Sequence, residues 1–378
     1  MLKKRVGAIL VWLAISFALL NFIETRASEL NFSVETILPD NQITEGVSYF
    51  DLLLAPSETQ TVQIRLTNNT DEDIVVLPVI ATATTNHNGV VEFVPRDVER
   101  DSTLMYLMEE IVTVPEEVII PANGVYLLDL DIEMPEEAFE GILAGGITLR
   151  ERDEELDEME ENDEAGMTIR NLFEFVVGIV LQNDASASVQ VEPDLVLREV
   201  YPTHINRRNV IIANVQNVMP NFVRSLTVDA RIMREGSEEV LFYLEIDEAH
   251  MWRMAPNSNI DIPIRLEGEA LEPGDYILDL RMTARHQTED EDIEIEKVWQ
   301  WREPFSITEA EATFLNSEDV TIPATFDFPW LPVLIVLLTV VFVVLLVIRL
   351  THNKRVRQRE KFDDLEKRLL EIQSRYKQ

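Results

Sequence analysis

The sequence contains no cysteine among its 378 residues. A disulfide framework, a thiolate nucleophile and a cysteine-based zinc site are therefore excluded. A chain of this length is still long enough to form two ordinary domains, each with an apolar core of its own. Because no covalent cross-link is available, those cores must stabilise the domains alone.

Positive charge is scarce between the two ends of the chain. Residues 28–328 contain 18 Arg and Lys against 63 Asp and Glu, a balance of −45, and the formal net charge of the whole chain is −37. Such a chain does not bind nucleic acid by neutralising phosphates.

Lysine is almost absent from the same residues, because Lys297 is the only one there, whereas the short C-terminal tail has four. The reference pKa of Lys is about 10.4 and that of Arg is above about 12, so Arg keeps its charge in alkali. A dense carboxylate surface also stays hydrated in strong salt. We therefore hypothesise an alkaline or saline medium around residues 28–328. The alternative is a general drift of the composition from Lys to Arg, which would lower the lysine content of the tail as well.

Catalytic and metal-binding motifs are missing too. The sequence has neither an HExxH nor a GxSxG motif, and its histidines are scattered: His87, His204, His250, His286 and His352. The acidic stretches 68–74 and 288–296 lack the glycine-punctuated spacing of a calcium loop and predict solvated turns. We therefore predict no enzyme, no metal and no cofactor, and disfavour a wall hydrolase or esterase.

Both ends of the chain carry long apolar runs. Residues 1–27 have a basic start, an apolar run over 6–22 and a plausible cleavage position after Ala27, which predicts a secretory signal peptide; a retained N-terminal anchor is the alternative. Residues 329–350 predict a transmembrane helix, with Trp330 at its outer edge.

The residues after this span are basic, which indicates that the tail lies in the cytoplasm and residues 28–328 lie outside. The tail, residues 351–378, has apolar residues at steps of three and four: Phe362, Leu365, Leu369, Ile372 and Tyr376. This spacing predicts a helix on the inner leaflet, or alternatively a short dimerising helix.

Residues 28–309 are predicted to be mainly β, with two Ig-like antiparallel β-sandwiches in tandem. Apolar and polar residues alternate in short runs separated by turns, and one helical turn is predicted within 101–111. We predict a first domain at 28–150, whose last core strand is "GILAGGITL", with glycines where another backbone approaches closely. Ten carboxylates follow among residues 151–164, and we interpret 151–166 as an acidic linker.

The second predicted sandwich spans 167–309 and is followed by a juxtamembrane linker at 310–328. It contains five large aromatic side chains that could form an exposed binding face: Phe242, Tyr243, Trp252, Trp299 and Trp301. Large aromatic residues usually fill cores, so we favour core positions for them and leave the ligand-binding residues unassigned.

The chain resembles the WxL-interacting proteins of Gram-positive bacteria over nearly the whole of residues 28–328. The resemblance is carried, in order, by "NFSVETILPDNQITEGVSYFDLLLAP", "TNNTDED", "TTNHNGVVEF", "VPEEVIIPANG", "MPEEAFEGILAGGI", "RRNVIIANVQN", "MWRMAPNSNIDIPI" and "LEPGDYILDL". It implies a first domain that binds peptidoglycan, a second that binds WxL-domain surface proteins or host and matrix proteins, and a C-terminal membrane span.

The function implied by this resemblance is a non-catalytic adaptor at the cell surface, held in the cell membrane by one helix. The acidic outer part departs from a simple adhesin, because anionic wall polymers would repel it at short range. Contacts to neutral sugar or peptide edges are therefore favoured. The alternative function is a single-span sensor that signals through its cytoplasmic tail.

If the scarcity of lysine adapts residues 28–328 to alkali, their unfolding midpoint should change little up to about pH 10.5, because Arg remains charged there. Urea unfolding across a pH series, followed by circular dichroism, measures this. A marked loss of stability before pH 10.5 would contradict the hypothesis.

Overall fold

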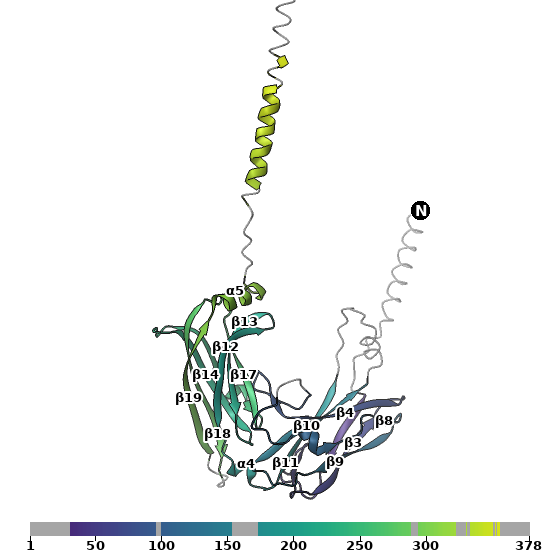
Figure 1. Ribbon diagram of the computed structural model, residues 1–378. Helices are drawn as coiled ribbons and strands as arrows, with labels where there is room; N and C mark the ends of the chain where they lie inside the picture. Colours follow the sequence, from purple (N-terminus) through teal and green to yellow (C-terminus); the bar gives the residue numbers. More distant parts are fainter. Residues whose placement is uncertain are drawn as a thin grey trace, which may run out of the picture. The chain divides into compact units, whose positions relative to one another are not determined.

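The computed structural model describes residues 31–95, 100–152, 173–288, 294–322, 330, 333–350, 352 and 354–355. The chain divides into two compact units, Met1–Ile322 and Pro323–Gln378. The first unit contains two β-sandwiches and the second contains one long helix (Figure 1). The predicted signal peptide and most of the predicted tail lie outside the described residues.

The first sandwich begins with a four-stranded sheet in the order β1-β3-β9-β7, called here the β3 sheet. Its strands are β1 (Phe32–Ile37), β3 (Thr59–Asn68), β9 (Val125–Glu133) and β7 (Val112–Thr113). Val62 pairs with Leu130 and Ile64 with Leu128, and all four side chains are buried. Because side chains alternate along a strand, the polar residues between them face outward.

The opposing sheet of the first sandwich has the order β2-β11-β10-β4-β8 and is called here the β10 sheet. Its strands are β2 (Phe50–Leu53), β11 (Glu174–Gln182), β10 (Ile142–Glu151), β4 (Ile74–Thr82) and β8 (Val118–Ile120). A small hairpin of β5 (Thr84–Thr85) and β6 (Val91–Glu92) follows β4. The predicted helical turn is α2 (Met108–Ile111), which buries Met108 and Ile111.

Strand β10 is buried on both of its faces. Leu143, Ile147 and Leu149 enter the core of the sandwich. An added Cβ at Gly145 would lie 2.6 Å from Met108, and one at Gly146 would lie 2.7 Å from Phe93. The glycines therefore stand where other chain segments approach closely, as the sequence predicts.

Strand β11 gives the main correction to the predicted domain boundaries. It follows the acidic segment, yet it pairs antiparallel with β10 and parallel with β2. Val177, Ile179 and Leu181 of β11 are buried in the first core. The predicted linker 151–166 therefore begins within β10 and belongs to the connection between two strands of one sheet, and it is not a linker between domains. The first sandwich extends to Gln182 and does not end at residue 150.

The second sandwich packs a three-stranded sheet, β12-β13-β17, against a sheet in the order β15-β14-β18-β19, with β16 also paired to β14. The strands of the three-stranded sheet are β12 (Leu195–Ile205), β13 (Arg208–Asn217) and β17 (Ser258–Arg265). Those of the other sheet are β14 (Val223–Arg234), β15 (Val240–Ile246), β16 (Trp252–Met254), β18 (Gly274–Gln287) and β19 (Glu294–Ile307). All these neighbours are antiparallel, so the predicted fold class is confirmed. Two short helices lie in the connections between strands: α4 (Ala187–Gln190) between β11 and β12, and η1 (Glu248–His250) between β15 and β16.

Helix α5 (Glu309–Glu318) corrects the predicted start of the juxtamembrane linker at residue 310. Its N-terminus is capped by Thr308, whose side chain accepts a hydrogen bond from the Glu311 N–H. Ala312 and Leu315 are buried in the core of the second sandwich. Asp319, just beyond the helix, accepts a 2.7 Å hydrogen bond from the Asn209 N–H. The helix therefore belongs to the second sandwich.

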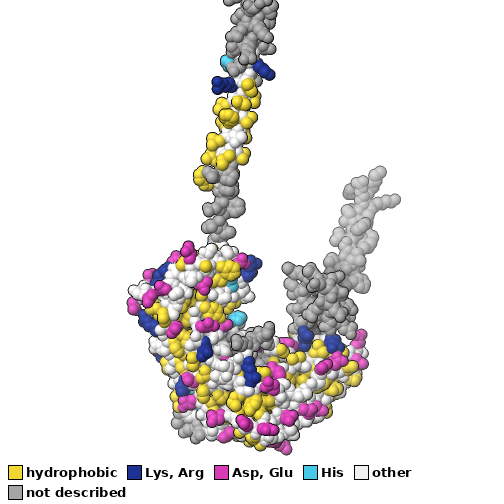
Figure 2. Space-filling model, viewed as in Figure 1, with side chains coloured by type: hydrophobic (Ala, Val, Ile, Leu, Met, Phe, Trp, Pro, Cys, Tyr) yellow, Lys and Arg dark blue, Asp and Glu magenta, His cyan; other side chains and the backbone are white. Residues whose placement is uncertain are grey.

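The second unit contains an apolar helix over Val333–Leu350, with a mean hydropathy of 3.3 and none of its residues buried. Eighteen residues at about 1.5 Å each are enough to cross the hydrocarbon layer of a bilayer. Figure 2 shows the hydrophobic side chains around this helix, with basic side chains at one end.

A first-sandwich fragment that ends at Glu151 should fail to fold, whereas one that ends at Asn183 should fold. The shorter fragment loses three buried β11 side chains, each worth about 1.5–3 kcal/mol, and this loss is comparable with the whole stability of a small domain, about 5–15 kcal/mol. Circular dichroism and urea unfolding of fragments 28–151 and 28–183 measure the difference. Equal stability of the two fragments would contradict the assignment of β11 to the first sandwich.

Candidate binding surfaces

The two sandwiches contact each other through a buried hydrogen-bond network centred on Asp101. This carboxylate accepts hydrogen bonds of 2.8 and 2.9 Å from the Gln216 side chain and of 2.6 Å from the Asn259 side chain. It also accepts one from the Thr103 N–H at 2.8 Å. A buried carboxylate with several donors orients the groups around it, because leaving any of them unpaired costs free energy.

A second set of contacts lies beside this network. Ser258 and Thr85 place their hydroxyl oxygens 2.7 Å apart, and the Gly89 carbonyl accepts a 2.9 Å hydrogen bond from the Arg253 N–H. Gly89 has a φ of +67°, and an added Cβ would lie 2.3 Å from the Trp252 ring. The sequence prediction did not identify these residues, because polar residues at buried strand positions reveal no partner until distant strands are placed together.

Small apolar side chains complete the contact. Ala144 of β10 and Ala83 are buried together with Ala255 of the second sandwich, and Phe93 and Phe222 pack against them. The main chain also crosses the contact, because the Ile142 N–H donates a 2.8 Å hydrogen bond to the Pro220 carbonyl. The "GILAGGITL" stretch thus also contacts the second sandwich, through Ala144 and the main chain of Ile142.

The outer face of the β3 sheet carries hydrogen-bonded polar pairs, next to the exposed side chains of Val125 and Leu127. Thr61 donates to Asp131 at 2.6 Å and Gln63 donates to Asp129 at 2.7 Å across the β3–β9 pair. Arg65 forms a 2.6 Å ion pair with Glu35. This "polar face", defined by residues Thr61, Gln63, Arg65, Asp129 and Asp131, presents hydroxyl, amide and carboxylate groups. Such groups can bind sugar hydroxyls or peptide groups without a net positive charge.

The aromatic residues of the second sandwich mostly belong to its core. Trp252 is buried, and Phe242, Trp299 and Trp301 are half-buried against the core. The Trp299 Nε1 donates a 3.0 Å hydrogen bond to Asp194. Tyr243 is the exception, because it is 73% exposed. Trp252 therefore occupies the expected core position and three of the others pack against the core, whereas Tyr243 is exposed.

Three of the five histidines have hydrogen-bond partners in the structure. His204 lies 2.9 Å from the Leu315 carbonyl, His286 lies 2.9 Å from the Val189 carbonyl, and His250 lies 2.7 Å from Asp247. No group of three or more His, Asp or Glu within the described ranges could hold a metal ion.

The carboxylates of the described acidic turn accept hydrogen bonds from the nearby 122–123 segment. In the 68–74 turn, Asp73 accepts a 2.8 Å hydrogen bond from the Ala122 N–H, and Asp71 accepts one of 3.0 Å from the Asn123 side chain. In the 288–296 stretch, residues 289–293 lie outside the described part of the chain.

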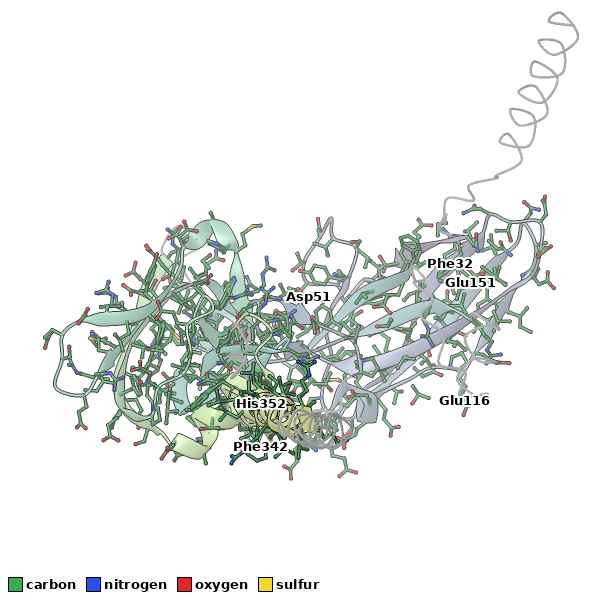
Figure 3. All side chains as sticks on the ribbon, turned by 90° about the horizontal axis from the view of Figure 1, so that it is seen from above. Phe32, Asp51, Glu116, Glu151, Phe342 and His352 are labelled. Atoms are coloured by element: carbon green, nitrogen blue, oxygen red, sulfur yellow. The ribbon has the colours of Figure 1, made fainter. Side chains whose placement is uncertain are left out.

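Asp51 of β2, labelled in Figure 3, is a buried carboxylate that accepts a 2.7 Å hydrogen bond from Gln182 of β11.

The sheet edges of the second sandwich differ in composition. Edge strand β19 carries five charged residues and Pro304, edge strand β12 contains Pro202, and edge strand β17 contains Pro263. Edge strand β15, "VLFYLEI", has one charged residue, Glu245, and no proline. Natural edges are usually protected by charge, proline or bulges. Strand β15 has a register shift against β14 between Val240 and Phe242, but it has no proline and only one charged residue.

Acidic residues flank β15 at both ends. They are Glu235, Glu238 and Glu239 before it, and Asp247 and Glu248 after it. Asp247 accepts hydrogen bonds from the His250 ring and from the Ala249 N–H, and these hold the pKa of its carboxyl below the usual range. The carboxylate therefore keeps its negative charge in mildly acidic solution.

Both sandwiches match family models. Residues 32–151 match the peptidoglycan binding domain of the WxL Interacting Protein family, and residues 164–317 match the host binding domain of the same family. The chain belongs to the WxL-interacting protein family. The two matched ranges meet at the acidic segment, although in this WxL-interacting protein β11 completes the first sandwich.

Comparison with solved structures finds distant matches. No curated protein matches the chain. A chaperone–tip adhesin complex of CFA/I fimbriae is 10% identical over 71% of this chain and 98% of its own, with a TM-score of 0.31. The CupB2 chaperone of Pseudomonas aeruginosa is 12% identical over 65% and 95%, with a TM-score of 0.26. Nothing about function follows from likenesses this distant.

Replacing Asp101 by Ala should lower the free energy of unfolding by about 1–3 kcal/mol, because the amide groups of Gln216 and Asn259 lose their buried acceptor. Urea unfolding of the full chain measures this. Glu116→Ala is the control, because Glu116 is an exposed carboxylate of the first sandwich (Figure 3). Equal effects of the two substitutions would show that the network does not stabilise the contact.

Proposed function

We propose that this chain is a membrane-anchored, non-catalytic adaptor at the bacterial cell surface. In this proposal the first sandwich binds peptidoglycan, and the second binds WxL-type surface proteins or extracellular host and matrix proteins. The observation that carries the proposal is the occurrence of a peptidoglycan-binding family match and a host-binding family match on two sandwiches of one compact unit.

The contact between the sandwiches supports an adaptor in which both binding domains act together. Asp101 and the small residues of β10 join the two domains through buried groups. A wall-bound first sandwich would therefore hold the second sandwich in a limited range of positions. Such positioning reduces the entropy lost when a partner binds.

We place wall binding at the polar face of the first sandwich. The outer part of the chain is strongly acidic, and Figure 2 shows acidic side chains over the visible surface of both sandwiches. Electrostatic adhesion to anionic wall polymers is therefore unfavourable. The Thr61–Asp131 and Gln63–Asp129 pairs present polar groups suited to neutral sugar hydroxyls and peptide edges.

The apolar helix supports the anchoring part of the proposal. Its length and hydropathy suit a single membrane span, with Trp330 before it and Arg349, Lys354 and Arg355 at or beyond its other end. By the positive-inside rule, the sandwiches would lie outside and the tail in the cytoplasm.

The full chain in detergent should sediment with isolated peptidoglycan and capture a purified WxL-domain protein. Fragment 28–183 should retain the wall binding, and fragment 184–322 should retain the capture of the WxL-domain protein. A salt series from low to high ionic strength tests whether wall binding is independent of charge, as the polar face requires. Absence of both activities at every salt concentration would contradict the adaptor function and favour a sensor that acts through its tail.

A triple variant locates the wall contact. Thr61→Ala, Gln63→Ala and Arg65→Ala together should weaken sedimentation with peptidoglycan by about tenfold, because three groups that bond polar ligands are lost. The matched control changes the same residue types on the outer face of the second sandwich: Thr227→Ala, Gln300→Ala and Arg231→Ala. If the control weakens wall binding as much as the triple variant does, the polar face is not the contact.

A further inference from the structure

We propose that the free edge of β15 binds a partner protein by adding one of its strands. The added segment would be extended, would alternate apolar and polar side chains, and would carry Lys or Arg at both ends. This inference rests on the proposed partner-binding function of the second sandwich and names the surface and the kind of segment that the sandwich binds.

Strand β15 has the position that strand addition requires. It is the end strand in the order β15-β14-β18-β19, and its pairing partners, Val228–Met233 of β14, lie along one side of it. In an antiparallel sheet, half of the main-chain N–H and C=O groups of an end strand point away from its neighbour. These groups can pair with an extended segment from another protein.

The side chains of β15 divide between the two faces of the sheet. Phe242 and Leu244 pack against the core of the second sandwich. Leu241 and Tyr243 point outward and are 38% and 73% exposed. An added strand would place side chains beside both sets, so apolar residues at alternate positions gain contacts with Leu241 and Tyr243.

Charge decides which kind of segment fits. Glu238 and Glu239 precede the strand, and Glu245 and Asp247 lie at its other end, and all four are exposed. A segment with basic residues about seven positions apart places opposite charges at both ends of β15. A polyanion such as a nucleic acid or a teichoic-acid-like polymer would be repelled.

The same charges disfavour a second copy of this chain as the occupant. In a symmetric antiparallel pair of β15 strands centred on Tyr243, Glu239 would come beside Asp247. A parallel pair in register would place each acid beside its own copy. Like charges directly opposite one another are destabilising, so the occupant is a different protein with basic ends.

The first test uses a synthetic peptide and the full chain in detergent. The peptide has seven alternating Val and Thr residues, matching the seven residues of β15, with two lysines at each end. A second peptide carries glutamates in place of the lysines. Fluorescence anisotropy should show binding of the lysine peptide and at least about tenfold weaker binding of the glutamate peptide. Equal binding, or no binding of either peptide, would overturn the proposal.

N-methylation of the peptide tests the strand geometry directly. Methylating alternate N–H groups blocks only one of the two edges of an extended peptide. Two isomers, methylated at the odd or at the even residues, should therefore differ, with one binding normally and the other not binding. Charge attraction alone would leave the two isomers equal, and that result would overturn strand addition.

Charge reversal on the protein completes the test. The variant Glu238→Lys, Glu239→Lys and Glu245→Lys should reverse the preference between the lysine and glutamate peptides. The control, Glu294→Lys, Glu296→Lys and Glu303→Lys, makes the same change of charge on exposed positions of edge strand β19 and should keep the original preference. Identical behaviour of the two variants would show that β15 is not the binding edge.

Failure of this proposal can be distinguished from failure of the proposed function. If the full chain captures a WxL-domain protein but does not bind the lysine peptide, and the β15 variant captures that protein normally, the adaptor function stands and the β15 edge is rejected. If the lysine peptide binds with the expected geometry and no WxL-domain protein is captured, the edge is confirmed and the WxL partner is rejected.

Discussion

The burial of β10 on both faces is the constraint on which the rest of the two-sandwich unit depends. Its inner side chains, Leu143, Ile147 and Leu149, form part of the first core, while Ala144 on the outer side contacts Ala255 of the second sandwich. Large residues on the outer side would keep Phe93 and the second sandwich away. The glycines and alanines of this strand therefore determine both the packing of one domain and its contact with the next.

Strand β10 also depends on its neighbour β11, which returns to the first sheet after the acidic segment. The acidic segment that follows Glu151 thus comes between two strands of one sheet in the chain and not between two domains. The acidic run is consequently poor evidence for a domain boundary.

Surface charge and sheet edges together limit which extended chains can pair with the sheets of the second sandwich. The outer face of the β3 sheet satisfies its own polar groups in pairs, and most edges of the second sandwich are protected by charge or proline. Unselective pairing with other chains is thereby disfavoured. Strand β15 differs, and the acidic residues at its ends restrict which segments can approach it.

The sequence by itself determined the β-sandwich class, the alternation of buried residues such as Val62 and Ile64, the apolar helix near the C-terminus and the family. Each of these depends on local periodicity, composition or an ordered set of motifs. Only the tertiary structure decided that β11 belongs to the first sandwich, that α5 packs on the second, and that Asp101 meets Gln216 and Asn259. An alternating strand fits either of two sandwiches equally well, and its partners are chosen by long-range packing that no local pattern encodes.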